Sequence, residues 1–196
     1  MAKENVNEHP GFVLWFTGLP CSGKSTLASC AEGWLHSCGY RAVVLDGDNI
    51  RHGLCKDLGF SEEDRRENIR RVAEAAKLFA EAGIIVLTAL ISPFRVDRES
   101  ARTLFPADNF LEIYCNCPLA VCEARDVKGH YRQARSGALA NFTGISSPYE
   151  NPLNPDLELD TSALTPEQCV ERLRALLPLR FPYFFQPPGK TAASIA

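Results

Sequence analysis

The segment 18–25 contains the residues of this sequence whose types and spacing are best suited to chemistry. It reads Gly-Leu-Pro-Cys-Ser-Gly-Lys-Ser and fits the pattern G-x-x-x-x-G-K-[ST] at every fixed position. A buried strand is predicted before it, at residues 12–16, and a helix after it, at residues 26–36. Backbone N–H groups and the positive end of the helix dipole then point at one spot. We therefore expect a polyphosphate site, with Lys24 at the β- and γ-phosphates and the Ser25 hydroxyl on Mg²⁺.

Strands and helices alternate along the rest of the chain. Strands are predicted at 41–45, 84–91, 110–115 and 157–160, and helices at 61–82, 95–105, 131–140, from 118 to about 126, and from 165 to just before Pro178. This alternation predicts an α/β fold, a P-loop three-layer sandwich whose parallel sheet has helices on both faces. Ligands of such sheets bind beyond the carboxyl ends of the strands, which gathers segments 18–25, 46–49 and 92–94 at one edge.

Local signals place the ends and the buried face of the long predicted helix. Ser61 is expected to cap its N-terminus and Gly83 to end it. The apolar residues at helical spacing, expected to be buried, are Ile69, Val72, Ala73, Ala76, Phe79 and Ala80.

Length and composition predict one domain. The chain has 196 residues, of which 45% are hydrophobic, and we expect one P-loop kinase domain over 1–178 and a Pro-rich tail over 179–196. The aromatic residues of the tail, Phe181, Tyr183, Phe184 and Phe185, are expected to pack back on the domain, and the last part of the tail to be mobile.

Charge and hydropathy exclude several classes of partner. The net charge of −3 argues against bulk nucleic-acid binding. No apolar run approaches the ~20 residues that span a bilayer, so no membrane partner is expected. Residues 1–10 are polar and acidic, unlike a signal peptide, so we expect a cytoplasmic protein.

The eight cysteines lack the spacing of a zinc site and suit reduced thiols. Cys115 and Cys117 lie in an apolar run and are expected in the core. Cys21 lies inside the phosphate loop at a helix N-terminus, so its redox sensitivity is a hypothesis.

Further polar residues follow the predicted strands and helices. A carboxylate within segment 46–51 could hold Mg²⁺ through water or accept a hydroxyl proton, although an Asx-turn explains Asp46 equally well. Arg51 could pair with a phosphate or sulfate oxygen. Arg65 and Asn68 share a helical face and suit an anionic ligand, or form part of a solvated charged face.

Two other groups have a functional and a structural interpretation. The basic segment 125–135, with Gly129 as a hinge, could close over phosphates or be an exposed basic helix. Phe60 and Phe142 occur in loop-like segments, where they could stack on a flat base or pack within the loops.

Seven segments in order resemble those of the adenylyl-sulfate kinase family, and the similarity covers roughly residues 11–177. They are Asp-Gly-Asp-Asn at 46–49, Leu-Gly-Phe-Ser at 58–61, Arg65 with Asn-Ile-Arg at 68–70, Ile-Ser-Pro at 91–93, Arg-Asp-Val-Lys-Gly at 125–129, Ala-Arg-Ser-Gly at 134–137 and Asn-Phe-Thr-Gly at 141–144. The resemblance implies transfer of the γ-phosphate of ATP to the 3′-hydroxyl of adenosine 5′-phosphosulfate (adenylyl sulfate), giving 3′-phosphoadenosine 5′-phosphosulfate (PAPS) and ADP in sulfate assimilation.

The resemblance also implies a role for each matching residue. The ATP-binding residues would be Gly18, Leu19, Pro20, Cys21, Ser22, Gly23, Lys24, Ser25, Thr26 and Arg125. The residues that bind adenylyl sulfate would be Asp48, Asn49, Arg51, Phe60, Arg65, Asn68, Ile91, Ser92, Lys128, Asn141 and Phe142, with Phe60 and Phe142 sandwiching its adenine. Lys24, Asp48 and Ser92 would be catalytic, and Ser25 and Asp48 would hold Mg²⁺. The family implies a homodimer and leaves an association with ATP sulfurylase open.

Three questions stay open at this point. Ser92 matches a serine described as a phosphoserine intermediate, whereas direct transfer needs only alignment and charge. The family commonly has Gly-Leu-Ser-Gly-Ala-Gly-Lys in its loop, and here Pro20 lacks a donor and Cys21 replaces a glycine. The alternative functions are another small-molecule P-loop kinase, such as a nucleoside or sugar kinase, and a non-catalytic nucleotide-binding module.

Overall fold

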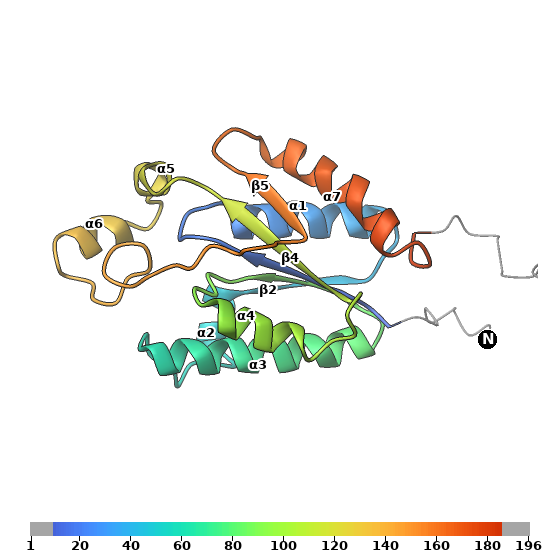
Figure 1. Cartoon of the computed structure of the whole chain (residues 1–196), viewed down its shortest axis with the longest axis horizontal. Coiled ribbons are helices and arrows are strands. Elements are labelled where there is room, and N and C mark those ends of the chain that lie inside the picture. The colour runs from blue at the N-terminus through green and yellow to red at the C-terminus, as the bar shows by residue number, and fades with distance from the viewer. Residues whose placement is uncertain (1–9, 186–196) are drawn as a thin grey trace, which may run out of the picture.

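A computed structural model describes residues 10–185 of the chain. Its centre is a parallel sheet of five strands in the order β2-β3-β1-β4-β5 (Figure 1). The strands are β1 (Val13–Thr17), β2 (Ala42–Asp46), β3 (Ile85–Ala89), β4 (Phe110–Asn116) and β5 (Leu157–Asp160). The strand–helix alternation therefore predicted the parallel sheet correctly, and β5 lies at its edge as a short strand.

Helices cover both faces of the sheet, which confirms the three-layer fold (Figure 1). One face carries α1 (Lys24–Ser37) and α7 (Pro166–Arg180), and the other carries α3 (Glu62–Glu81) and α4 (Arg95–Arg102). The short helices α2 (Gly47–His52), α5 (Leu119–Arg125) and α6 (His130–Arg135) lie toward the carboxyl ends of the strands.

The central strand β1 divides the core into two parts because its side chains alternate between the faces. Phe12, Leu14 and Phe16 belong to the apolar cluster beneath α1 and α7. Val13 and Trp15 belong to the cluster beneath α3 and α4. All five side chains are completely buried, so the strand that leads into the phosphate loop is held from both sides.

The predicted helix caps are present. The Ser61 hydroxyl accepts a hydrogen bond from the Asp64 N–H at 3.1 Å, and this begins α3. Thr165 and Gln168 form a reciprocal capping box at the start of α7. These caps satisfy N–H groups that would otherwise lack a partner in the first turn.

Four local predictions were wrong. Phe79 is exposed, because it lies beyond the edge of the α3 stripe that faces the sheet. The helices expected at 95–105 and 131–140 end early, at Arg102 and Arg135, and segment 47–52, to which the sequence assigned no element, forms the helix α2. The last helix does not end before Pro178 but continues to Arg180.

The continuation of α7 follows from what it buries. A proline inside a helix costs about 3 kcal/mol, while burying a leucine and a phenylalanine each contributes about 1.5–3 kcal/mol. Leu177 and Phe181 flank Pro178 and are completely buried.

The aromatic residues after α7 pack on the domain, as predicted. Phe181 stacks on Phe12 with ring centroids 3.7 Å apart, and Phe184 meets Phe12 edge-on at 5.3 Å. The last part of the tail, 186–196, lies outside the described residues, and the domain boundary at 178 stays a prediction.

Cys115 and Cys117 are buried, as expected. Within residues 10–185, none of the helices combines the length and the apolar character needed to cross a membrane.

Candidate active site

The loops after β1, β2 and β3 meet at the carboxyl edge of the sheet, as the fold requires. The first loop is the phosphate loop, residues 18–23, which leads into α1. The second enters α2 at Asp46, and the third contains Ile91 and Ser92. Helices α5 and α6 approach the same edge (Figure 1).

The phosphate loop is tightly folded and holds its own lysine. A Cβ at Gly18 (φ +151°) would lie 2.6 Å from the Cys115 carbonyl oxygen, so only glycine fits there. The buried ammonium group of Lys24 donates to the carbonyl oxygens of Gly18 at 3.0 Å and Leu19 at 2.6 Å. Burial lowers the pKa of Lys24 because it disfavours the charged form. An anionic phosphate in the loop would offset that cost.

Cys21 adopts a backbone conformation that suits glycine. Its φ is +59°, in the left-handed region that costs most other residues energy. The departure from the family pattern therefore places a strained residue at the tip of the loop. Three groups from outside the loop hold the backbone here, the hydroxyls of Tyr131 and Thr161 and the guanidinium of Arg125.

The Ser25 hydroxyl donates to Asp46 rather than to Asp48. The distance from Ser25 Oγ to Asp46 Oδ2 is 2.6 Å, and Asp46 Oδ1 accepts the N–H of Asp48 at 2.9 Å. The second contact is the Asx-turn expected for Asp46, and it caps α2. The sequence allowed a capping or a metal-binding role for Asp46, and its contact with Ser25 was not anticipated.

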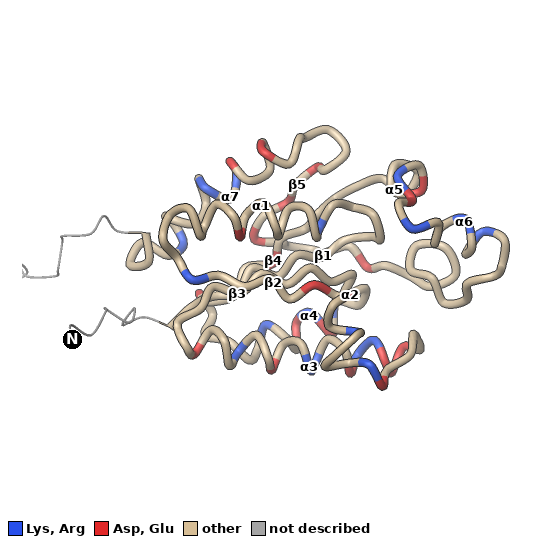
Figure 2. The backbone as a smooth tube through the Cα atoms, turned by 180° about the vertical axis from the view of Figure 1, so that it is seen from behind, with Lys and Arg blue, Asp and Glu red and all other residues tan. Residues whose placement is uncertain are grey.

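The exposed carboxylate of Asp48 pairs with the ammonium group of Lys128. This contact joins the first turn of α2 to the basic segment 125–135. That segment begins at the last residue of α5 and includes α6. Figure 2 shows Lys and Arg along this segment. The hydrogen bond between Lys128 and Asp48 raises the pKa of Lys128. Asn49 lies exposed beside Asp48 in α2, and Thr26 lies exposed in the first turn of α1.

Arginines gather around Phe60. The guanidinium carbon of Arg51 lies 4.4 Å from the centroid of the Phe60 ring, and that of Arg65 lies 5.7 Å from it. Burial lowers the pKa of both arginines, and for Arg65 the charge of Arg51 adds to the effect. Two cations held this close favour an anionic ligand.

Asn68 lies about one turn after Arg65 in α3 and is buried. Its side-chain Nδ2 has no hydrogen-bond partner within residues 10–185, although its exposed fraction is only 5%. A buried amide donor without a partner is costly and marks a place where a ligand can complete the hydrogen bonding.

Arg65 joins the segments that carry the two candidate stacking residues. Its Nε donates to the Phe60 carbonyl at 3.1 Å, and its Nη2 donates to the Asn141 carbonyl at 2.6 Å. Phe60 is 54% exposed, whereas Phe142 is half-buried and packs against Tyr131. The adenine sandwich between Phe60 and Phe142 stays a prediction.

Ser92 is buried and its hydroxyl has two partners. It donates to Thr17 Oγ1 at 2.9 Å and accepts from Trp15 Nε1 at 3.2 Å. Its φ is +40°, and Arg98 donates to its carbonyl oxygen at 2.7 Å. The neighbouring Ile91 carbonyl accepts from Thr17 at 2.8 Å. Ser92 is therefore fixed in the core of the edge rather than presented on its surface.

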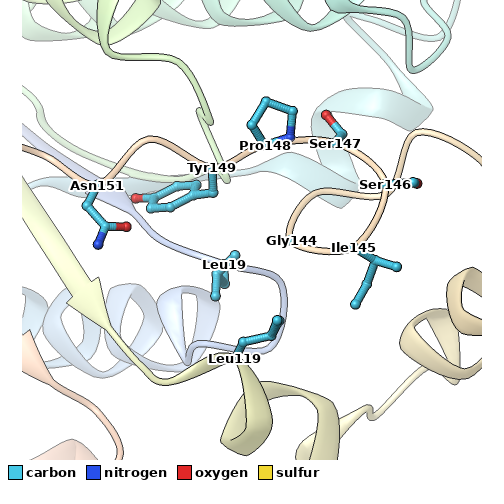
Figure 3. Close-up of a pocket in the computed structure, with 9 residues that line it drawn as sticks. All are labelled: Leu19, Leu119, Gly144, Ile145, Ser146, Ser147, Pro148, Tyr149 and Asn151. Carbon is cyan, nitrogen blue, oxygen red and sulfur yellow. The ribbon is translucent and has the colours of Figure 1, made fainter.

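A pocket of about 490 Å³ lies beside the phosphate loop (Figure 3). Leu19 and Leu119 form one wall, and the segment 144–151 forms the other. Among the residues assigned to a site from the sequence, only Leu19 lines it. The arginines around Phe60 and the carboxylates of Asp46 and Asp48 lie outside it.

Known proteins match the chain over most of its length. A family model described as adenylylsulphate kinase matches residues 10–160. The adenylyl-sulfate kinase of Prochlorococcus marinus is 58% identical over 170 residues, which cover 87% of this chain and 85% of that protein. That of Marinobacter nauticus is 56% identical over 173 residues, covering 88% and 86%.

A solved structure agrees with the sequence relatives. The APS kinase of Mycobacterium tuberculosis, in complex with AMPPNP and APS, has a TM-score of 0.83 and 46% identity, covering 86% of this chain and 98% of that one. With the phosphate loop, the carboxylates and the arginines at one sheet edge, these matches show that the chain belongs to the adenylyl-sulfate kinase family.

Proposed function

We propose that the chain transfers the γ-phosphoryl group of ATP to the 3′-hydroxyl of adenylyl sulfate, forming PAPS and ADP. The observation that carries this proposal is the meeting of two binding environments at one edge. The phosphate loop with buried Lys24 lies on one side, and the Arg51–Arg65 pair with unsatisfied Asn68 lies on the other. Asp48 lies in the first turn of α2, directly after the strand end whose Asp46 contacts Ser25.

The phosphate loop is assigned to ATP. Its backbone and Lys24 bind the phosphates, and Ser22, Gly23 and Thr26 complete the turn into α1. Arg125 lies beside the loop, where it donates to the Cys21 carbonyl at 3.3 Å, and is assigned to the ATP base.

Oxygen donors suitable for Mg²⁺ lie at the loop. Ser25 Oγ and Asp46 Oδ2 are in contact, with Asp48 two residues further on. Within residues 10–185, no three His, Cys, Asp or Glu side chains form a metal cage. Proteins hold Mg²⁺ through one or two carboxylates together with substrate phosphates, and Ser25 and Asp46 supply oxygen donors at the loop. When bound, Mg²⁺ offsets charge on the β- and γ-phosphates.

The arginine side is assigned to adenylyl sulfate. Arg51, Arg65 and Asn68 would bind the phosphosulfate and ribose, and Phe60 and Phe142 would stack on the adenine. The remaining residues of the proposed pocket are Asn49, Ile91, Ser92, Lys128 and Asn141.

Asp48 is proposed to orient the attacking hydroxyl and to accept its proton. The carboxylate lies on the surface and, within residues 10–185, is paired with Lys128 alone, so substrate can replace this exposed lysine at low cost. Lys128 is then free to approach the migrating phosphoryl group.

Ser92 is proposed to act by position. Its hydroxyl is held by Thr17 and Trp15, so we propose direct in-line transfer from ATP rather than a phosphoserine intermediate. Chiral-phosphate analysis tests this, because one transfer inverts the configuration at phosphorus and two transfers retain it.

A coupled assay of ADP release tests the function. Purified chain is mixed with ATP and Mg²⁺, with and without adenylyl sulfate, and with nucleosides and sugars as alternative acceptors. ADP and PAPS are expected only with adenylyl sulfate. Transfer to a sugar or nucleoside would assign another kinase activity, and binding of ATP without turnover would assign a non-catalytic nucleotide-binding module.

We also propose that the chain acts in the cytoplasm as a homodimer. The support is membership of the adenylyl-sulfate kinase family, whose resemblance to this chain implies a homodimer. Sedimentation analysis of the chain, alone and mixed with an ATP sulfurylase, measures the dimer and any association with that enzyme.

A further inference from the structure

Five consecutive carbonyl groups of the phosphate loop each accept a hydrogen bond from a side chain. Lys24 donates to the first two, at Gly18 and Leu19. The other three, at residues 20–22, accept from Tyr131 at 3.0 Å, Arg125 at 3.3 Å and Thr161 at 2.8 Å. The loop therefore depends on distant segments for its shape, most of all around strained Cys21.

Tyr131 is the one of these three donors whose side chain contacts both proposed substrate sites. Its hydroxyl donates to the carbonyl of Pro20, in the loop assigned to ATP. Its ring meets the ring of Phe142 edge-on, with centroids 4.9 Å apart and planes at 82°. Phe142 is assigned to the adenine of adenylyl sulfate.

The Tyr131 side chain has little freedom to move independently of its neighbours. It is only 2% exposed. The Asp126 carboxylate accepts the N–H groups of Tyr131 at 2.9 Å and Arg132 at 3.1 Å, which fixes the start of α6. Burial raises the pKa of Tyr131, so its hydroxyl keeps its proton and remains a donor.

A second contact joins the phosphate loop to the segment that contains Phe142. A Cβ at Gly144 would lie 3.0 Å from Leu19 Cδ2, so the segment after Phe142 lies directly against the phosphate loop. Figure 3 shows Leu19 facing the 144–149 segment. Leu19 and Phe142 also pack against the same small buried cluster, which includes Tyr131.

We propose that Tyr131 is a positioning residue that couples binding at the ATP site to binding at the adenylyl-sulfate site. This rests on the proposed function. An adenine that packs on Phe142 restricts that ring, and the restricted ring holds Tyr131 in place. The tyrosine hydroxyl then holds the Pro20 carbonyl in the conformation that accepts phosphate. By linkage the effect is reciprocal, and each nucleotide tightens the other by the same factor.

Titration calorimetry with ADP, Mg²⁺ and adenylyl sulfate measures this coupling, since ADP has no γ-phosphate to transfer. The coupling factor is the ADP Kd without adenylyl sulfate divided by the ADP Kd at saturating adenylyl sulfate. We expect a factor of at least about 5 in the wild type, the lower end of ordinary coupling. In Tyr131→Phe, which keeps the ring and removes the hydroxyl, it should fall to below about 2, while loss of one buried hydrogen bond lowers the melting temperature by only about 2–4 °C.

Tyr183→Phe is the matched control. It also removes a tyrosine hydroxyl, which donates to Asn109 Oδ1 at 3.3 Å outside both proposed substrate sites. Its coupling factor should equal that of the wild type.

A wild-type factor of 1, or an unchanged factor in Tyr131→Phe, overturns the inference. So does an equal loss of ADP affinity with and without adenylyl sulfate, because that result assigns the hydroxyl to loop stability alone. Failure of adenylyl sulfate to bind even at saturating ADP and Mg²⁺ contradicts the proposed function instead.

Discussion

Replacing Asp48 by asparagine should separate catalysis from stability. The substitution keeps the shape of the side chain and removes its charge. Asp48 is 65% exposed and its partner Lys128 is 54% exposed, and an ion pair this exposed contributes about 0–1 kcal/mol. Its charge in the first turn of α2 contributes about 0.3–1 kcal/mol more through the helix dipole. The free energy of unfolding should therefore fall by less than about 2 kcal/mol.

The expected effect on turnover is larger. A group that accepts a proton and orients the attacking hydroxyl contributes about 10²–10⁴-fold, which is about 3–5 kcal/mol of the activation free energy. Initial rates of ADP release at saturating ATP and adenylyl sulfate give kcat, and urea titration gives the free energy of unfolding. Asp46→Asn is the comparison variant. Both carboxylate oxygens of Asp46 accept hydrogen bonds in the fold, so this substitution should lower stability as well as activity.

Two results would refute this reasoning. A kcat of Asp48→Asn within about threefold of the wild type would remove Asp48 from the chemistry. A loss of more than about 3 kcal/mol in unfolding free energy would show that the exposed pair with Lys128 is a structural element instead.

The remaining predictions concern stability, substrate affinity and pH. Arg98→Met should lower the unfolding free energy, measured by urea titration, by about 3–5 kcal/mol, because it leaves Glu112 buried without its main partner at 2.6 Å. The double variant with Glu112→Leu should recover at least half of this loss, and an additive loss would contradict the prediction. Phe60→Ala should raise the Kd of adenylyl sulfate, measured by calorimetry, about 5–150-fold through lost stacking. The Kd of ADP should not change. An unchanged Kd for adenylyl sulfate would exclude Phe60 from the adenylyl-sulfate site. Hydrogen bonds, chiefly from Arg70, lower the pKa of Glu67 from 4.5 to about 2. The contribution of Glu67 to stability is therefore complete above pH 4.5 and is lost as the pH falls through about 2. Glu67→Gln should flatten the fall of the urea midpoint between these pH values, and an equally steep fall would contradict this prediction.

The parts of the fold that follow from local sequence could be predicted. The period of the apolar residues predicted α1, α3 and the central strands. Ser61, as a capping residue, and the segment that begins at Thr165, with a proline in the first turn, marked two helix starts. The errors occurred where tertiary packing outweighs local preference. The buried Phe181 keeps α7 helical through Pro178, which sequence rules treat as a helix end.

The candidate site was predictable to the extent that its residues form a continuous motif. The phosphate loop and the Asp46 turn are local and were recognised. The contacts of Tyr131 with Pro20 and of Thr161 with Ser22 join residues more than 100 positions apart. Nothing in the spacing of these residues indicates such a contact, so only the folded structure could reveal it.

The order of the strands in the sheet affects how the chain can fold during synthesis. Val13 of β1 pairs with Val86 and Phe110, so both neighbours of the central strand are made long after it. At about 5–20 residues per second, the ribosome needs roughly 4–14 s to add the roughly 70 residues before the first partner. Throughout that interval this strand, which is completely buried in the fold, is unpaired in the nascent chain. We therefore expect chaperones that bind extended apolar segments to engage the chain before its phosphate loop exists in folded form.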